Sequence, residues 1–145
     1  MTCVNCQCDQ QHCYSFCEYD RLLVVCGNPC ERLVTLVPNA TLGKGTPLTR
    51  TSSGDYTLFD PSATPPQRFA GLLAVSARTD ADGYVYFGQP WHPAPGLRQV
   101  PMYISGTFDL RDLDATTDQL NAIVAQGRGY IDGDVNTRRG VLHLY

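Results

Sequence analysis

Hydrophobic and polar side chains alternate most regularly in the stretch from Val100 to Leu113. In an extended chain this alternation puts two sets of side chains on opposite faces: Met102, Ile104 and Thr107 on one face, and Tyr103, Ser105 and Phe108 on the other. Gly106 interrupts the two-residue period, and a glycine inside a strand usually marks a bulge or a close backbone approach. The pattern therefore predicts a half-buried strand with a bend or bulge at Gly106.

Other short apolar runs, separated by turn residues, predict further strands. The most apolar run, residues 69–77, predicts a central buried strand. The remaining predicted elements are a hairpin of residues 22–25 and 33–37 around residues 27–29, a second hairpin of residues 47–51 and 56–59 around residues 52–55, a short strand at residues 84–87, a turn at residues 132–134 and a C-terminal strand at residues 140–145.

One segment carries the signals of a helix. Asp114 or Thr116 can serve as the N-cap of an apolar run at residues 120–125, and Gly127 or Gly129 can end the helix. The sequence thus predicts a mainly β fold, a small β-rich body with one short helix at about residues 116–126.

The composition is that of a globular protein without a nucleic-acid or membrane partner. The chain has 145 residues, of which 43% are hydrophobic, enough for one domain with an additional arm. Its 13 glycines and 10 prolines favour short strands and turns over long helices. A net charge of -3 argues against nucleic acid, because phosphate binding requires clustered Lys and Arg. We see no apolar run of membrane-spanning length and no signal-peptide core, so we expect synthesis in a cytosol.

All cysteines fall at the beginning of the chain: Cys3, Cys6, Cys8, Cys13, Cys17, Cys26 and Cys30. The polar region around them lacks hydrophobic periodicity, so it needs cross-links, a metal or a partner surface to become ordered. We therefore assign residues 1–39 to a Cys-rich N-terminal arm or small subdomain. Residues 40–145 form the β-rich body. The boundary between the two parts falls in a small polar linker at residues 39–47.

The cysteines allow either a zinc site or a disulfide framework. The Cys-x-x-Cys spacing of Cys3 and Cys6 matches a zinc knuckle, and the further zinc ligands would come from His12, Cys26 and Cys30. A second tight Cys-x-x-Cys is missing, and all seven cysteines are equally candidates for disulfides, with one left over. The cytosol disfavours disulfides, but a protein carried outside the cell would oxidise. Disulfides, zinc and free thiols all stay open, and we expect no cofactor other than such zinc.

The sequence lacks the motifs of common hydrolases, Gly-x-Ser-x-Gly and His-Glu-x-x-His. Ser76 or Ser105 could be combined with His143 and an aspartate, but any β protein offers such triplets. We therefore predict that the chain is not an enzyme.

Four segments follow one another in an order that resembles the head decoration proteins of lambda-like tailed phages: Gly45-Thr-Pro-Leu48, Tyr56-Thr-Leu-Phe-Asp60, Phe69-Ala-Gly-Leu-Leu-Ala-Val75 and Met102-Tyr-Ile-Ser-Gly-Thr-Phe108. In that family a Thr-Pro-Leu start, a Gly-Leu-Leu-Ala-Val-type strand and a Tyr-x-Ser-Gly-Thr-Phe strand occur in this order. A short helix and a C-terminal strand come next. The resemblance covers residues 40–145 and rests on the order and spacing of short motifs.

The resemblance implies a protein without an active site. Family members form homotrimers at the threefold and quasi-threefold positions of the expanded head, where they clamp the shell against DNA pressure. Their N-terminal arm contacts the major capsid protein by adding to a sheet edge, and backbone hydrogen bonds supply the affinity. The implied partners are the major capsid protein, other copies of the chain and neighbouring trimers. The implied location is the outer capsid surface of the virion.

Two regions depart from the family pattern. The region before Ala40 is longer than a simple arm and Cys-rich, and residues 88–96 form an insertion that carries the only tryptophan. We interpret the N-terminal region as an elaborated arm, held by disulfides or zinc, that rests on the capsid surface or on a neighbouring trimer. The candidate interface residues are apolar: Leu22, Val24, Leu33, Leu36 and Trp91.

Two other classes of function stay open. The N-terminus could be the working part of a metal-binding, zinc-knuckle-like interaction module, with the β body as its scaffold. Alternatively, the body could be a small hydrolase or a lectin-like domain that binds sugar at Trp91. A metal module would lose its N-terminal order in a chelator, whereas a decoration protein would be a stable trimer without any ligand.

Overall fold

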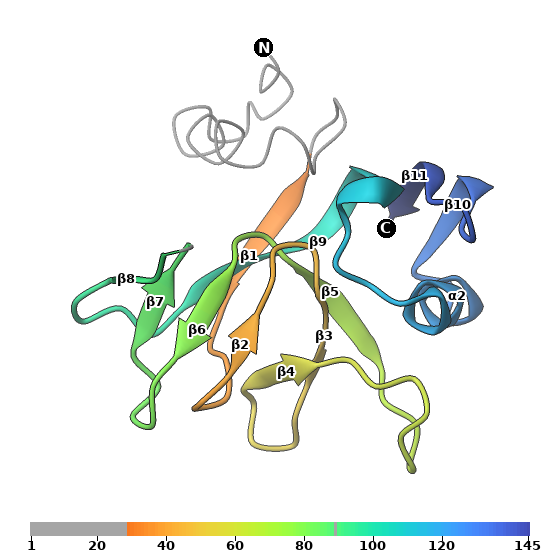
Figure 1. Cartoon of the computed structure of the whole chain (residues 1–145). Coiled ribbons are helices and arrows are strands. Elements are labelled where there is room, and N and C mark those ends of the chain that lie inside the picture. The colour runs from red at the N-terminus through yellow and green to blue at the C-terminus, as the bar shows by residue number, and fades with distance from the viewer. Residues whose placement is uncertain (1–28, 89) are drawn as a thin grey trace.

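The computed structural model describes residues 29–88 and 90–145, which form two β-sheets and one α-helix (Figure 1). The elements in chain order are β1 (Cys30–Val34), β2 (Thr41–Leu42), β3 (Pro47–Arg50), β4 (Tyr56–Leu58), β5 (Phe69–Leu73), β6 (Ala77–Thr79), β7 (Val85–Phe87), β8 (His92–Pro93), β9 (Val100–Asp109), the 3-10 turn η3 (Leu110–Asp112), α2 (Thr117–Ala125), β10 (Gly129–Asp134) and β11 (Arg139–Leu144). The predicted mainly β fold with one short helix is confirmed.

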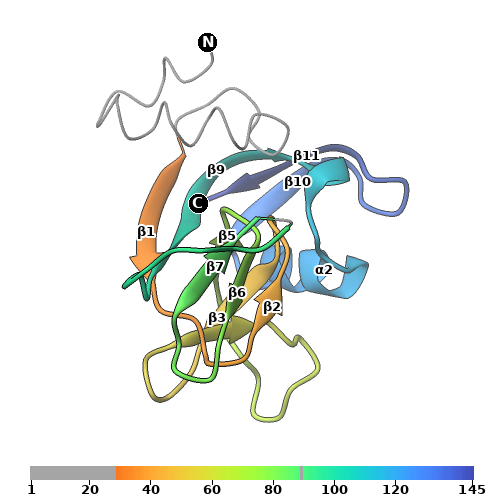
Figure 2. The ribbon, with the colours of Figure 1, turned by 60° about the vertical axis from the view of Figure 1, so that its left-hand side comes forward.

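The larger sheet is curled, as Figure 2 shows. Its strands run in the order β10-β11-β9-β5-β3-β4, and β1 also pairs with β9. Beyond β1, Leu36 forms a parallel bridge with Tyr56 of β4. There the N–H of Tyr56 donates to the carbonyl of Thr35 (2.8 Å), and the carbonyl of Tyr56 accepts from the N–H of Val37 (2.9 Å). Five strands, β1, β9, β5, β3 and β4, therefore form a closed ring.

The smaller sheet, in the order β2-β6-β7-β8, is tied to the ring by residues 39–47. The Thr79 hydroxyl donates to the carbonyl of Val37 (2.6 Å) and accepts from the N–H of Ala40 (2.9 Å). The N–H of Gly45 donates to the carbonyl of Leu73 (2.7 Å). The segment that we interpreted as a linker thus includes β2 and joins the two sheets.

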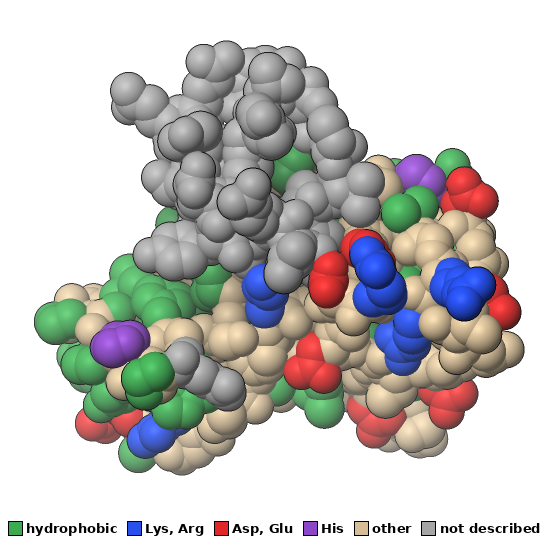
Figure 3. Space-filling model, turned by 45° about the horizontal axis from the view of Figure 1, so that its top comes forward, with side chains coloured by type: hydrophobic (Ala, Val, Ile, Leu, Met, Phe, Trp, Pro, Cys, Tyr) green, Lys and Arg blue, Asp and Glu red, His purple; other side chains and the backbone are tan. Residues whose placement is uncertain are grey.

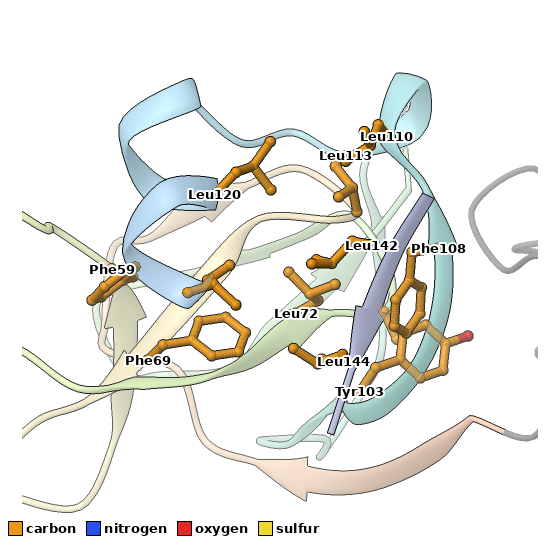
Figure 4. Close-up of a cluster of buried hydrophobic side chains, with 12 residues drawn as sticks. Phe59, Phe69, Leu72, Tyr103, Phe108, Leu110, Leu113, Leu120, Leu142 and Leu144 are labelled. Atoms are coloured by element: carbon orange, nitrogen blue, oxygen red, sulfur yellow. The ribbon is translucent and has the colours of Figure 1, made fainter. Parts of the chain in front are cut away.

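Two hydrophobic clusters lie on opposite faces of β5 and β9, since successive side chains of a strand point to opposite sides. The helix-side core, shown in Figure 4, consists of Phe59, Phe69, Leu72, Ala74, Tyr103, Phe108, Leu110, Leu113, Leu120, Ile123, Leu142 and Leu144. The ring core consists of Val34, Leu36, Leu48, Tyr56, Leu73, Ala77, Val85, Val100 and Met102.

Burial on both faces explains why β5 is the most apolar run of the chain. Leu72 lies in the helix-side core and its neighbour Leu73 in the ring core, and both are fully buried. Gly71 lets β5 approach β9, because a Cβ at this position would lie 2.5 Å from the carbonyl oxygen of Tyr103. The predicted central strand is confirmed, although it ends at Leu73 and the chain re-enters the other sheet at Ala77.

The predicted irregularity at Gly106 changes the face on which the side chains of β9 lie. Gly106 has a φ of 139°, which non-glycine residues rarely adopt. In a regular strand Tyr103 and Phe108, five residues apart, would point to opposite faces. Here both belong to the helix-side core, with ring centroids 5.2 Å apart. The register with β1 shifts between Tyr103 and Ser105, whereas the register with β11 is regular from Gly106 to Asp109. The predicted irregularity is therefore present, but it begins before Gly106.

The helix α2 begins at the predicted N-cap, Thr116 rather than Asp114. The Thr116 hydroxyl accepts from the N–H of Gln119 (3.1 Å), and the Gln119 side chain accepts from the N–H of Thr116 (2.8 Å), which completes a capping box. Leu120 and Ile123, three residues apart, face the helix-side core. No helix in the described residues is long and apolar enough to cross a membrane.

The guanidinium of Arg128 joins β5, β9 and the end of the chain. Its Nε donates to the carbonyl of Tyr145 (3.0 Å) and its Nη1 to that of Phe69 (2.9 Å). Its Nη2 lies 3.5 Å from the carbonyl oxygens of Ala70 and Ile104. One planar group thus supplies donors to carbonyls of three segments, a geometry that the fork of an arginine permits.

Two sequence-based expectations differ from the observed strands. Residues 132–134, which we predicted as a turn, belong to β10 and pair with β11, and Gly133 faces Gly140 across the ladder. A Cβ at either glycine would lie 2.1 Å from a carbonyl oxygen of the opposite strand, so the two glycines permit the close pairing. In the first predicted hairpin, residues 22–25 lie outside the described residues.

The arm that we assigned to residues 1–39 is built into the body over its described part. Residues 30–34 are β1 and pair with β9, and Val34 lies in the ring core. Residues 35–37 continue to β4 and close the ring. The Cys-rich segment therefore joins the body at Pro29, which lies against Gly106.

Replacing Gly106 by alanine tests the change of face. The strained backbone and contacts of 3.0 Å to Phe108 and 3.2 Å to Pro29 should lower the free energy of unfolding by about 3 kcal/mol. Gly96→Ala is the matched control, since Gly96 also has a positive φ but nothing within 4 Å of the added Cβ, and should cost about 1 kcal/mol. Equal losses in urea unfolding would contradict the assignment.

Arg128→Met tests the guanidinium junction, because methionine is a long apolar side chain that donates no hydrogen bond. The carbonyls of Phe69 and Tyr145 lose their donor, so we expect a loss of about 2–4 kcal/mol in thermal or urea unfolding. Arg128→Lys should restore less than half of it, because a single ammonium cannot reach all three segments. Arg139→Met, at an exposed position of β11, serves as the control and should change stability by less than about 0.5 kcal/mol.

Candidate interaction surfaces

Most residues that we predicted for zinc or disulfide chemistry lie outside the described residues, as do two of the interface candidates: Cys3, Cys6, Cys8, His12, Cys13, Cys17, Leu22, Val24 and Cys26. Cys30 is described: it is exposed at the start of β1, opposite Ser105, and it is the one cysteine of residues 29–88 and 90–145. Within the described residues, no three His, Cys, Asp or Glu side chains are grouped so that they could hold a metal ion.

The two leucines predicted for an interface have opposite environments. Leu33 is 56% exposed near the end of β1, so it is available to a partner. Leu36 is 1% exposed and lies in the ring core, where its backbone bridges to Tyr56. The prediction for Leu36 is therefore wrong, because closure of the ring buries this side chain.

Trp91 lies half buried in the turn between β7 and β8. The turn leads into His92 and Pro93, which are exposed and pair with Phe87 and Tyr86 of β7. Trp91 is thus partly covered and is not a fully exposed side chain.

Two tyrosines of the small-sheet lobe each stack with an arginine. The guanidinium carbon of Arg98 lies 4.2 Å from the ring centroid of Tyr84, and that of Arg78 lies 5.3 Å from the ring centroid of Tyr86. Arg78 and Tyr86 are cross-strand neighbours in β6 and β7. We call Arg78, Tyr84, Tyr86 and Arg98 the tyrosine–arginine surface.

The tyrosine–arginine surface combines positive charge with exposed aromatic area. The interaction with Tyr84 raises the pKa of Arg98, and the carboxylates of Asp82 and Asp80 add to this rise. Arg98 Nη1 also donates to the carbonyl of Asp82 (2.8 Å). Hydrophobic side chains gather on the same side of the molecule, at the left of Figure 3, where Figure 1 places β6, β7 and β8. Tyrosine and arginine next to apolar area are typical of protein interfaces.

A second exposed surface lies on β10 and β11. Tyr130 and His143 are cross-strand neighbours whose rings stack, with centroids 4.6 Å apart and planes inclined by 25°. The ring of Tyr145 lies 6.5 Å from that of Tyr130. Tyr130 is 51% and Tyr145 62% exposed. We call Tyr130, His143 and Tyr145 the aromatic row, which offers stacking area to a partner.

Two of the residues that we weighed for hydrolytic chemistry, His143 and Ser76, have other hydrogen-bond partners. His143 Nδ1 lies 3.1 Å from the hydroxyl of Thr107, its neighbour on β9. The Ser76 hydroxyl accepts from the backbone N–H of Lys44 (3.0 Å) and so helps to join the two sheets. Both groups have structural partners.

The aromatic row could not be predicted once residues 132–134 had been assigned to a turn. With β10 predicted as a strand, Tyr130 would have paired with the C-terminal strand, in which His143 and Tyr145 alternate on one face. The tyrosine–arginine surface had no usable signal, since the stacking of Arg98 on Tyr84 joins two loops.

Comparison of the chain with protein-family models, with curated proteins and with solved structures finds no match.

The stacked pair in the aromatic row can be tested with a double-mutant cycle. Tyr130→Ala and His143→Ala should each destabilise the protein, and the coupling between them should be about 0.5–1 kcal/mol in urea unfolding, as for other aromatic cross-strand pairs. The pair Tyr84 and His143, on different sheets, serves as the control and should be additive. Additive losses for Tyr130 and His143 would show that the rings do not stack in solution.

Proposed function

We propose that the chain is a head decoration protein of a tailed bacteriophage and works as a structural component of the virion, not as an enzyme. The observation that carries the proposal is the order of the elements. Each segment with a motif of the family overlaps a strand of the body: β3, β4, β5 and β9. The helix α2 and the C-terminal strand β11 follow, as the resemblance implies.

The proposed protein acts as a homotrimer on the outer surface of the expanded head. Trimers occupy threefold and quasi-threefold positions between capsomers and hold the shell against the pressure of the packaged DNA. Three copies that each bind weakly give a high avidity when they are joined in one rigid body. The two surfaces described above, with exposed tyrosines and arginines, are suited to contacts between copies and with the shell.

The N-terminal region is proposed to contact the major capsid protein. Two features support this role: the region joins the body at the start of β1, and the exposed Leu33 lies within that strand. Seven cysteines within the first thirty residues would fix the region by disulfides or zinc once the particle is outside the cell. Intact virions analysed on reducing and non-reducing gels, and for zinc content, distinguish these two forms of cross-link.

Light scattering of the purified chain, with and without DNA-free heads of its phage, tests the proposal. We expect a mass three times that of one chain, and binding to expanded heads but not to unexpanded heads. A monomer that binds neither form of the head would end the decoration proposal.

Surface variants sharpen the same experiment. Leu33→Ser should weaken binding to expanded heads by about tenfold, a loss of about 1.4 kcal/mol. Leu58→Ser is the matched control, since Leu58 is exposed to a similar degree (46%) on β4. Equal effects of both substitutions would contradict a contact between β1 and the expanded head.

A further inference from the structure

The tyrosine–arginine surface presents its two stacked pairs side by side on one strand. Val85 is 1% exposed, so Tyr84 and Tyr86, which flank it, lie on the outer face of β7. Positions two residues apart in a strand are separated by about 7 Å. Arg98 stacks on the first ring and Arg78 on the second, and both arginines are exposed. Two guanidinium groups thus accompany neighbouring aromatic rings on one face.

The two arginines keep charge for a partner, since neither forms a salt bridge within the described part of the chain. Arg78 lies between Thr41 and Tyr86 in the ladder, and neither neighbour is acidic. Asp80 lies near Arg98, but its Oδ1 accepts from two backbone N–H groups of its own loop (both 2.9 Å). Carboxylates on a partner would therefore find arginine donors here.

The β10 edge carries acidic groups at the same spacing. We use this name for Tyr130, Asp132 and Asp134, which alternate along β10 and lie on one face of the sheet. All three are exposed, and neither carboxylate forms a salt bridge within residues 29–88 and 90–145, although Arg139 is opposite Asp134 in the ladder. β10 is the last strand of its sheet among the described residues, so no neighbouring strand covers the two carboxylates on that side.

The two surfaces lie at opposite ends of the molecule. Figure 1 places β6, β7 and β8 at the left and β10 at the right. One chain therefore cannot bring its own arginines to its own β10 edge, whereas the next copy can. A contact between two different surfaces of identical chains is head-to-tail, and it closes into a ring when the rotation between copies fits. A ring of three needs one third of a turn for each copy.

We propose that the tyrosine–arginine surface of one copy binds the β10 edge of the next copy. The two guanidinium groups pair with the carboxylates of Asp132 and Asp134, and the two tyrosine rings add apolar contact beside Tyr130. An arginine can stack on an aromatic ring and bind a carboxylate with its planar fork at the same time. The inference rests on the proposed homotrimer and names the contact that closes it.

Charge reversal in the full chain, followed by light scattering over a range of concentrations, tests the contact. Arg78→Glu with Arg98→Glu should raise the concentration at which half of the chains form trimers by about hundredfold, because like charges then face each other. Asp132→Arg with Asp134→Arg should have the same effect. The chain with all four substitutions should assemble to within about tenfold of the unsubstituted chain, since opposite charges face each other again.

Two controls separate the contact from general effects of charge. Arg50→Glu with Arg68→Glu makes the same change in net charge at exposed positions outside both surfaces, and it should leave assembly unchanged. Raising sodium chloride from about 0.05 M to about 0.5 M should weaken assembly of the unsubstituted chain by about tenfold, because salt screens charge pairs. Cooperative urea unfolding verifies that each variant is folded, and the salt experiment tests the contact without any substitution.

The outcomes separate this contact from the trimer itself. An unsubstituted chain that is monomeric at all concentrations would overturn both. Trimers that are insensitive to salt and to reversal of either surface would overturn the contact alone, as would loss of assembly without recovery in the chain with all four substitutions. Trimers that keep their mass after arginine reversal but no longer bind expanded heads would assign the tyrosine–arginine surface to the major capsid protein, against the proposal.

Discussion

The fold depends on one strand that serves two cores, and this depends on the backbone at Gly106. Before the glycine, Tyr103 points into the helix-side core and Met102 into the ring core. Between Tyr103 and Gly106 the register with β1 shifts and Gly106 has a φ of 139°, and beyond this irregular stretch Phe108 joins Tyr103 in the helix-side core. Only a residue without a Cβ adopts this conformation at low cost. The same glycine gives room for Pro29, through which the Cys-rich segment joins the body.

Other contacts follow from this arrangement. β9 pairs with β1 and β5 over its first half and with β11 beyond Gly106, so β5, β9 and the end of the chain come together beside the irregular point. Their carbonyls meet the guanidinium of Arg128. Beyond Gly106, Thr107 pairs with His143 of β11. His143 belongs to the aromatic row, together with Tyr130 and Tyr145. The bend that connects the cores thus also positions an exposed surface.

Local patterns in the sequence predicted the elements that depend on local chemistry. The shifted alternation around Gly106, the Thr116 cap and the apolar run of β5 are all visible in a few consecutive residues. Contacts between distant residues were not predictable in this way. Leu36 is buried because the ring closes against Tyr56, twenty residues later. β10 reads as a turn because Asp132-Gly-Asp134 has turn composition, and only pairing of Gly133 with Gly140 makes it a strand. Six of the seven cysteines lie outside the described residues, so their chemistry stays a prediction.

The central functional proposal is that the protein binds between the capsomers of a phage head and stabilises its shell. Electron cryomicroscopy of expanded, DNA-free heads mixed with the protein tests it most directly. The account predicts three copies around every threefold and quasi-threefold position, with the N-terminal region of each copy against the major capsid protein. Density for single copies, density confined to the fivefold vertices, or shells without added density would contradict it.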